Sequence, residues 1–280
     1  GAASSMFKKA NIETHILSTG DSQIGDYASE LSALGYTVTH APFAKKPGFI
    51  RSVFNLLREE EFDVVHVHTE RFFLVYILIA KLAGVKKIIR TIHSTFRFDG
   101  FLGIRRKLML HIGAKLGCKY LSISKGVQEN ELLLNNIDSV LINNWINTEH
   151  FKPVNTTETP SMQTIRVISV GACSHVKQHC AILTVVSVLK EKDYHVEYFH
   201  LGTGELEKSE TNLARDLKIE ENVHFVGNQK NVLPWLYKAD FFLMSSLYEG
   251  LGNSCAEAMS AGLIPIVNDV PGLRDLVKHE

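Results

Sequence analysis

Two glutamates enclose a glycine-containing loop near the C-terminal end of the sequence. The segment SLYEGLGNSCAEAMSAG, residues 246–262, places Glu249 directly before Gly250-Leu251-Gly252 and places Glu257 eight positions after Glu249. The glycines let a phosphate group or a sugar ring approach the backbone closely. A carboxylate accepts hydrogen bonds from hydroxyl groups but repels phosphate, so the glutamates suit sugar or ribose hydroxyls better. The segment therefore predicts a binding site for a phosphate-bearing sugar.

A short helix is expected directly after this loop, ending at Gly262. Asn253 and Ser254 are residue types that accept hydrogen bonds at a helix N-cap. The first backbone N–H groups of a helix have no partner within it, and together with the helix dipole they form a site for anions. We therefore expect Asn253 or Ser254 to cap the helix and its first N–H groups to face a phosphate.

The loop and the helix belong to a repeated alternation of strands and helices. Short apolar runs predict strands at residues 13–19, 37–43, 63–69, 86–93, 119–125, 139–145, 165–172, 195–202, 222–227, 239–246 and 264–269. Amphipathic patterns predict helices at residues 26–36, 49–61, 72–84, 106–117, 180–192, 206–219, 231–239 and 255–262. This alternation predicts an α/β protein whose parallel sheets are covered on both faces.

One polar stretch interrupts the alternation. Residues 150–164, HFKPVNTTETPSMQT, contain two prolines and four threonines, which is typical of an inter-domain linker. We therefore predict two domains, residues 1–151 and residues 152–280. Ligands bind at the carboxyl ends of strands in open α/β sheets, so functional residues should follow strands. The first and last residues suggest that segments of the two domains are missing at both ends.

The composition of the chain bears on its partners and on its location. The chain of 280 residues carries formal net charge +0, so no basic excess favours a nucleic-acid partner. Its four cysteines are scattered, without a C-x-x-C pair, and predict buried thiols in a reducing, cytoplasmic setting. No signal peptide is visible and no apolar run approaches the ~20 residues of a membrane span, which predicts a soluble or peripheral protein.

The segment from Glu249 to Ile266 resembles a known family signature. EGLGNSCAEAMSAGLIPI is similar to the glutamate–seven–glutamate motif of retaining glycosyltransferases of family four, the glycosyl transferases group 1, which includes many bacterial polysaccharide enzymes. The resemblance implies the GT-B fold, two Rossmann-like domains whose parallel sheets face a central cleft. It also implies that residues 1–151 bind the acceptor and residues 152–280 the donor. In that family the first glutamate contacts the donor sugar and the second contacts the ribose, which implies these roles for Glu249 and Glu257.

Further segments that follow strands share the resemblance. Residues 169–179 are similar to a family loop that carries an arginine and a lysine for the donor diphosphate; Lys177 matches the lysine, whereas Ala172 stands in the arginine position. Residues 200–205 resemble a glycine-rich turn, and residues 223–228 resemble a segment along the base. The donor contacts implied, besides the two glutamates and Lys177, are Gly171, Gly202, Gly204, Glu205, Gly227, Gly250, Leu251, Gly252 and Asn253.

Histidines are the candidate functional residues of the first half. His93 resembles a family histidine that faces the donor sugar, where it would bond a hydroxyl or manage the acceptor proton; a structural histidine is the alternative. His66 and His68 lie on one side of a strand, but no third ligand accompanies them and the family needs no metal, so no metal site is predicted. Trp145 and Asn147 depart from the family's glycine and aspartate.

A mixed aromatic and basic segment follows His93. Aromatic and basic side chains together suit an anionic membrane surface, and family acceptors are often lipid-linked sugars. A mobile loop before a basic helix is the alternative interpretation. The residues concerned are Phe96, Arg97, Phe98, Phe101, Leu102, Arg105, Arg106 and Lys107.

The expected function is transfer of a sugar, with retention, from a nucleotide-diphosphate sugar to a hydroxyl acceptor. The co-substrate would be a UDP- or GDP-sugar, the acceptor a glycan or lipid-linked sugar, and the setting capsule, exopolysaccharide or lipopolysaccharide assembly at the inner face of the plasma membrane. Glu249, His93 and Lys177 are the expected catalytic residues, with no cofactor and no metal. The alternatives are a GT-B nucleotide-sugar epimerase, a degenerate nucleotide-sugar-binding scaffold, and an NAD-type oxidoreductase, whose G-x-G-x-x-G motif is absent.

Overall fold

The computed structural model describes residues 4–20, 24, 27–44, 47–95, 97–154 and 164–277. The chain folds into two compact units. The first comprises Gly1–Ile92, Phe98–Leu121 and Asn135–Ser139; the second comprises His93–Arg97, Ser122–Leu134 and Val140–Glu280. The second unit thus takes in three stretches that precede the expected boundary after residue 151. Phe96 and most of the expected linker lie outside the described residues.

The strands of the first half form two sheets in the described part of the chain. Strands β1 and β2 pair in parallel with each other, and a second sheet has the order β3-β4-β5-β6, with β3 and β4 parallel. The helices and strands are α1 (Ser4–Lys9), β1 (His15–Ser18), α2 (Ala28–Ala33), β2 (Thr37–His40), α3 (Pro47–Glu59), β3 (Val64–Val67), α4 (Phe73–Leu82), β4 (Lys87–Ile92), α5 (Gly100–Lys115), β5 (Cys118–Ser122), α6 (Lys125–Asn135) and β6 (Val140–Leu141).

Helix α5 begins earlier than its apolar pattern predicts. The helix was expected from residue 106 but starts at Gly100, so part of the aromatic and basic segment is helical. Arg106 is buried, and its Nε donates to Glu70 Oε1 over 2.8 Å; the carboxylate of Glu70 also pairs with buried Arg90. The expectation that Arg106 faces a membrane surface is therefore wrong, because this guanidinium neutralises an acid inside the first unit.

The second half forms one five-stranded sheet with the order β11-β10-β7-β8-β9, and each strand runs parallel to its neighbours. Each expected strand and helix of this half is present, with ends that differ by a few residues. They are β7 (Ile165–Val170), α7 (His179–Glu191), β8 (Val196–Leu201), α8 (Glu207–Asp216), the 3-10 helix η1 (Glu220–Asn222), β9 (Val223–Gly227), α9 (Leu233–Leu236), β10 (Phe241–Met244), α10 (Asn253–Ser260) and β11 (Ile264–Val267).

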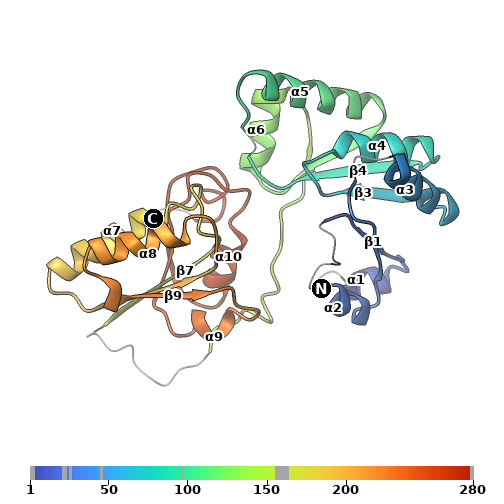
Figure 1. The fold of residues 1–280 in the computed structure, drawn as a ribbon. Helices are drawn as coiled ribbons and strands as arrows, with labels where there is room; N and C mark the ends of the chain where they lie inside the picture. The colour runs from blue at the N-terminus through green and yellow to red at the C-terminus, as the bar shows by residue number, and fades with distance from the viewer. Residues whose placement is uncertain are drawn as a thin grey trace. The chain divides into compact units, whose positions relative to one another are not determined.

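Both faces of this sheet are covered by helices (Figure 1). Because successive side chains of a strand point to opposite faces, neighbouring residues of β7 enter different cores. Val167 packs with residues of α7 and α8, whereas Ile168 packs with residues of α9 and α10. The apolar strands are therefore buried on both sides, as expected for a parallel sheet, and polar side chains collect at the strand ends.

The register of the sheet determines which loops are neighbours. Ser169 and Val170 of β7 pair with His200 and Leu201 of β8, so both strands end at the same level. The Gly171 N–H donates to the Leu201 carbonyl over 2.9 Å, which holds the two following loops side by side. The loops that carry the expected donor contacts thus leave adjacent strands.

Among the described residues, no helix is long and apolar enough to cross a membrane.

Candidate functional site

An ion pair joins two of the expected catalytic residues. Lys177 Nζ donates to Glu249 Oε1 over 2.6 Å, and both side chains are partly buried, at 22% and 15% exposure. The aliphatic stem of Lys177 covers Gly171, where an added Cβ would lie 3.1 Å from Lys177 Cε. The loop after β7 and the loop after β10 therefore bring a cation and an anion together at a position that solvent reaches.

The glycines after β7, β8 and β9 permit close contact between backbones. A Cβ on Gly202 would lie 1.9 Å from the Gly171 carbonyl oxygen, and a Cβ on Gly204 would lie 2.4 Å from the Cys173 carbonyl oxygen. The Gly202 N–H donates to the Gly227 carbonyl over 3.0 Å. The loops of these glycines pack together as one glycine platform, and backbone packing already requires the small size of Gly202 and Gly204.

The loop between the two glutamates is held by the backbone of other segments. A Cβ on Gly250 would lie 2.0 Å from the His93 carbonyl oxygen, and the Ser124 hydroxyl donates to the Gly250 carbonyl over 2.5 Å. Leu251 is buried, and the glycines on either side of it are buried as well. His93 is exposed and belongs to the second unit. The structure thus places His93 and Gly250 next to each other.

Helix α10 starts differently from the expectation. Its N-cap is Gly252, in the left-handed region at φ 71°, without a side-chain cap, and Asn253 is its first helical residue. The Ser254 hydroxyl donates to the Val170 carbonyl at the end of β7 over 3.2 Å. The expected capping role of Asn253 or Ser254 is therefore wrong: glycine makes the sharp turn, and Ser254 ties the helix start to the central strand instead.

The two glutamates lie in different electrostatic surroundings. Glu249 is neutralised by Lys177. Glu257 lies one turn inside α10, and partial burial raises its pKa above the ordinary 4.5, an effect that nearby His150 opposes. Glu205 is exposed at the end of the turn after β8. A carboxylate held in a partly buried position without a strong cation is suited to accept hydrogen bonds from hydroxyl groups.

His66 and His68 of the first half lie close to each other and to a threonine of the neighbouring strand. His66 Nε2 lies 2.7 Å from Thr91 Oγ1, and the His66 and His68 ring centroids are 4.0 Å apart. In the described part of the chain this pair is not joined by a third ligand into a candidate metal site.

Trp145 is 61% exposed, and nothing in the structure explains its place in the otherwise matching segment.

Sequence reasoning missed a buried polar cluster directly under the glycine platform. Cys173, His179, His200 and Glu210 bring their ligand-type atoms within 4.8 Å of one another. Burial, with His179 next to it, lowers the pKa of His200 to about 4, and burial, with Glu210 next to it, raises the pKa of Cys173 to about 12. The signal was present in the sequence, because Cys173 and His179 flank one loop and His200 ends the strand beside it.

Comparisons with known proteins identify the family. The profile described as glycosyltransferase family 4 matches residues 4–150, and the profile of glycosyl transferases group 1 matches residues 155–280. The GT-B fold is also found in solved structures: the chain aligns with HepE from Anabaena, in complex with UDP and glucose, at a TM-score of 0.78 and 15% identity, covering 99% of this chain and 77% of that one. The chain belongs to the family-four, group 1 glycosyltransferases.

Two curated relatives match most of the chain. EpsF from Bacillus subtilis is 26% identical over 87% of this chain and 68% of its own length. The Escherichia coli UDP-Gal:alpha-D-GlcNAc-diphosphoundecaprenol alpha-1,3-galactosyltransferase is 25% identical over 82% of this chain and 63% of its own length. The present chain thus spans roughly two thirds of the length of these relatives.

Proposed function

We propose that this protein transfers a sugar, with retention of configuration, from a nucleotide-diphosphate sugar to a hydroxyl group of a glycan or lipid-linked acceptor. The observation that carries the proposal is the convergence of Lys177, Glu249 and the start of α10 over the glycine platform. HepE was solved with UDP and glucose, and the Escherichia coli relative is named for a UDP-sugar donor and a diphosphoundecaprenol-linked acceptor. Both names support a sugar nucleotide as the donor here.

Binding of the donor would rearrange the Lys177–Glu249 pair. The diphosphate carries more negative charge than one carboxylate, so it competes for the ammonium group of Lys177. Glu249 is then released to accept hydrogen bonds from hydroxyls of the donor sugar. Glu257, one turn into α10, accepts hydrogen bonds from the ribose hydroxyls. Each charged group of the site thereby has a partner of suitable chemistry.

Departure of the diphosphate is the step that the site assists. Negative charge grows on the leaving oxygen as its bond to the sugar breaks, and Lys177 with the first N–H groups of α10 stabilises that charge. The acceptor hydroxyl attacks from the same face, and its proton passes to the leaving diphosphate. His93, whose backbone carbonyl lies against Gly250, would bond a sugar hydroxyl through its side chain. We expect no requirement for a divalent cation, because Lys177 and the first N–H groups of α10 would supply the positive charge.

A thermal-shift screen with nucleotide diphosphates and their sugars, with and without magnesium, tests the donor site. A ligand that binds the native state raises the unfolding midpoint, and we expect a shift with one sugar nucleotide that does not depend on magnesium. NMR of the transfer product then reports its anomeric configuration. A folded protein that responds to no nucleotide would contradict the proposal, and conversion of the donor without an acceptor would indicate an epimerase.

Helix α5 supports the further proposal that the acceptor is met at an anionic membrane surface. Phe101, Ile104 and Leu108 are 76%, 70% and 60% exposed and share one side of the helix with Arg105. Flotation with vesicles containing phosphatidylglycerol tests this surface at low salt. We expect the double variant Phe101→Ser/Leu108→Ser to lose binding and the control Leu133→Ser, at an 82% exposed leucine of α6, to keep it. Absence of binding by the native protein would overturn the proposal.

A further inference from the structure

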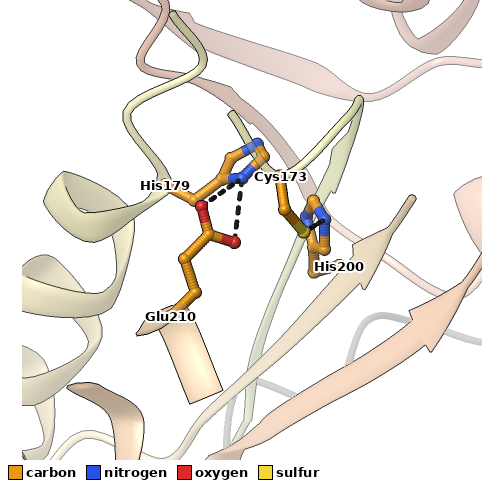
Figure 2. Close-up of side chains that lie close together, drawn as sticks. All are labelled: Cys173, His179, His200 and Glu210. Atoms are coloured by element: carbon orange, nitrogen blue, oxygen red, sulfur yellow. Dashed lines mark hydrogen bonds and ion pairs between the residues drawn. The ribbon is translucent and has the colours of Figure 1, made fainter. Parts of the chain in front are cut away.

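Four side chains from four different segments converge in the interior of the second unit (Figure 2). Cys173 comes from the loop after β7, His179 begins α7, His200 lies in β8, and Glu210 lies on α8. All four are buried, with at most 4% of their surface exposed. The proposed donor chemistry uses none of these residues.

The distances between the four groups are those of a ligand set. Cys173 Sγ lies 3.1 Å from His200 Nε2, and His179 Nδ1 lies 3.2 Å and 3.3 Å from the two oxygens of Glu210. All four ligand-type atoms lie within 4.8 Å of one another. In tetrahedral zinc sites the metal–ligand bonds of about 2.0–2.3 Å place the ligand atoms about 3.3–3.8 Å apart. Small side-chain rotations therefore suffice to close the four atoms around one ion.

A second layer of hydrogen bonds orients His200. The Ser169 hydroxyl oxygen lies 2.9 Å from His200 Nδ1 and 2.6 Å from the Tyr198 hydroxyl oxygen. If Nδ1 carries the proton and donates it to Ser169, Nε2 presents its lone pair toward Cys173. Metal-binding histidines in proteins usually donate their other ring N–H in this way, which holds the ring in place.

We propose that Cys173, His179, His200 and Glu210 bind one structural Zn²⁺ ion. A thiolate, two neutral imidazoles and a carboxylate carry two negative charges, which balance the ion and make the buried site neutral. Four protein ligands without an open position define a closed, structural site. On binding, the thiol of Cys173 loses its proton to solvent and His179 takes the tautomer with the proton on Nε2, so that Nδ1 binds the metal.

The ion would fasten the loop that carries Lys177. The Cys173 carbonyl accepts the Leu206 N–H over 3.0 Å, and the Cys173 N–H donates to the Thr203 carbonyl over 3.2 Å. Cys173 therefore already links the loops after β7 and β8, and a bond from its sulfur would join α7 and α8 to them. The role of the ion would be to stabilise the loops that form the glycine platform. This role does not depend on which ligand binds at the platform.

The metal content of the native full-length chain tests the proposal first. We expect protein purified without chelator to contain about one zinc ion per chain by mass spectrometry, and a strong chelator to lower its unfolding midpoint. After exchange with Co²⁺, the visible spectrum should show tetrahedral d–d bands and a thiolate-to-cobalt charge-transfer band. These readouts require neither donor nor acceptor, so they fail or succeed independently of the transferase proposal.

Matched cysteine variants separate this site from adventitious binding. Cys173→Ser should lose the thiolate band and most of the zinc, whereas Cys255→Ser, at an equally buried cysteine, and Cys180→Ser, at an exposed one, should keep both. His200→Gln provides a second test if Cys173→Ser does not fold. Native protein that contains no zinc, takes up none on addition and has a midpoint insensitive to chelator would show a hydrogen-bonded network only. Zinc retained by both ligand variants would also overturn the assignment.

Discussion

Two polar clusters lie at the carboxyl end of the same sheet, and solvent reaches one of them but not the other. The Lys177–Glu249 pair is 22% and 15% exposed, and its two partners come from loops. The Cys173 cluster is almost completely buried and takes ligands from a loop, a strand and two helices. A partly exposed ion pair can exchange one of its partners for a ligand, whereas a fully buried set of ligand-type side chains can only bind an ion or stay hydrogen-bonded to one another.

The two clusters therefore suit different roles at the same end of the sheet: the Lys177–Glu249 pair suits ligand binding, and the Cys173 cluster suits stabilisation of the loops. The loops around the Lys177–Glu249 pair approach one another closely because glycines leave room for backbone contacts. The Cys173 cluster holds the loops after β7 and β8 together from inside the protein. If both assignments hold, changes to the charged side chains of the donor site should alter kinetics with little effect on stability. Changes to the tightly packed glycines or to the buried Cys173 cluster should alter stability, and changes to the cluster should also alter metal content. Four variants test this division.

Glu249→Gln should have the largest effect on turnover. Glutamine preserves the size of the side chain but offers a weaker acceptor, and loss of a group aimed at the reacting sugar typically lowers kcat about 10²–10³-fold. The unfolding midpoint should change little because the amide oxygen still accepts from Lys177. Steady-state kinetics measure the loss, and Glu191→Gln at an exposed position of α7 is the control. Turnover near that of the native enzyme would remove Glu249 from the reaction.

Gly202→Ala should cause the largest loss of stability. Its φ of 139° is unfavourable for alanine, and the new Cβ would meet the Gly171 carbonyl oxygen at 1.9 Å. Strain and clash together should cost about 3 kcal/mol. Gly262→Ala, at φ 97° with its nearest neighbour at 3.5 Å, should cost only about 1 kcal/mol. Urea unfolding measures both; equal losses would show that the loops after β7 and β8 are not tightly packed.

Ser169→Ala tests the layer around the proposed metal. Removal of a hydrogen-bond partner behind a ligand histidine typically weakens metal affinity about 10–100-fold. Competition with a chromogenic chelator measures this change, and Ser187→Ala, at another buried serine of the same unit, is the control. A metal affinity that is equal in the two variants would place His200 outside the ligand set.

Glu257→Gln should produce the smallest change in stability, and the size of this change depends on pH. Burial raises the pKa of Glu257 in the folded state, so the folded state holds its proton more tightly than the unfolded state. Stability therefore falls as the pH rises through the range above 4.5, where the carboxylate becomes charged. The variant should have a slightly higher unfolding midpoint than the native protein near neutral pH and an equal one in acid.

The donor provides the second half of this prediction. If Glu257 binds the ribose hydroxyls, Glu257→Gln should raise the donor Kd by roughly tenfold, which corresponds to about 1.4 kcal/mol. Isothermal titration calorimetry measures the Kd. A more stable variant that binds the donor as tightly as the native protein would show that the partly buried carboxylate has no role in binding.

Secondary structure in the second half could be predicted because each strand is a short apolar run between polar loops. Helix α5 was placed too late because Gly100 and Gly103 disfavour a helix in its first turn, although the tertiary structure forms one there. The start of α10 was assigned to side-chain caps because sequence does not show that Gly252 adopts a left-handed turn. Local composition predicts helices and strands well where apolar residues recur at regular spacing. It predicts the ends of helices poorly where these depend on the backbone conformation of a single residue.

The candidate site could be predicted in its residue types but not in its pairings. Lys177 and Glu249 lie 72 positions apart, so their contact depends on the order of strands β7 and β10 in the sheet. Gly202 and Gly204 were expected to admit a ligand, whereas the structure shows that they first admit the carbonyls of Gly171 and Cys173. Neither relation is visible in a linear motif.

Short stretches of sequence are enough to predict the α/β class, the family resemblance and the glutamates around Gly250-Leu251-Gly252, because these depend on neighbouring residues. The folded chain is needed to see that four distant side chains, Cys173, His179, His200 and Glu210, meet, and that Arg106 is buried in the first unit. The physical reason is the same in both cases. Contacts between distant residues follow from strand order and helix packing, which depend on the burial of whole faces and not on any short stretch of chain.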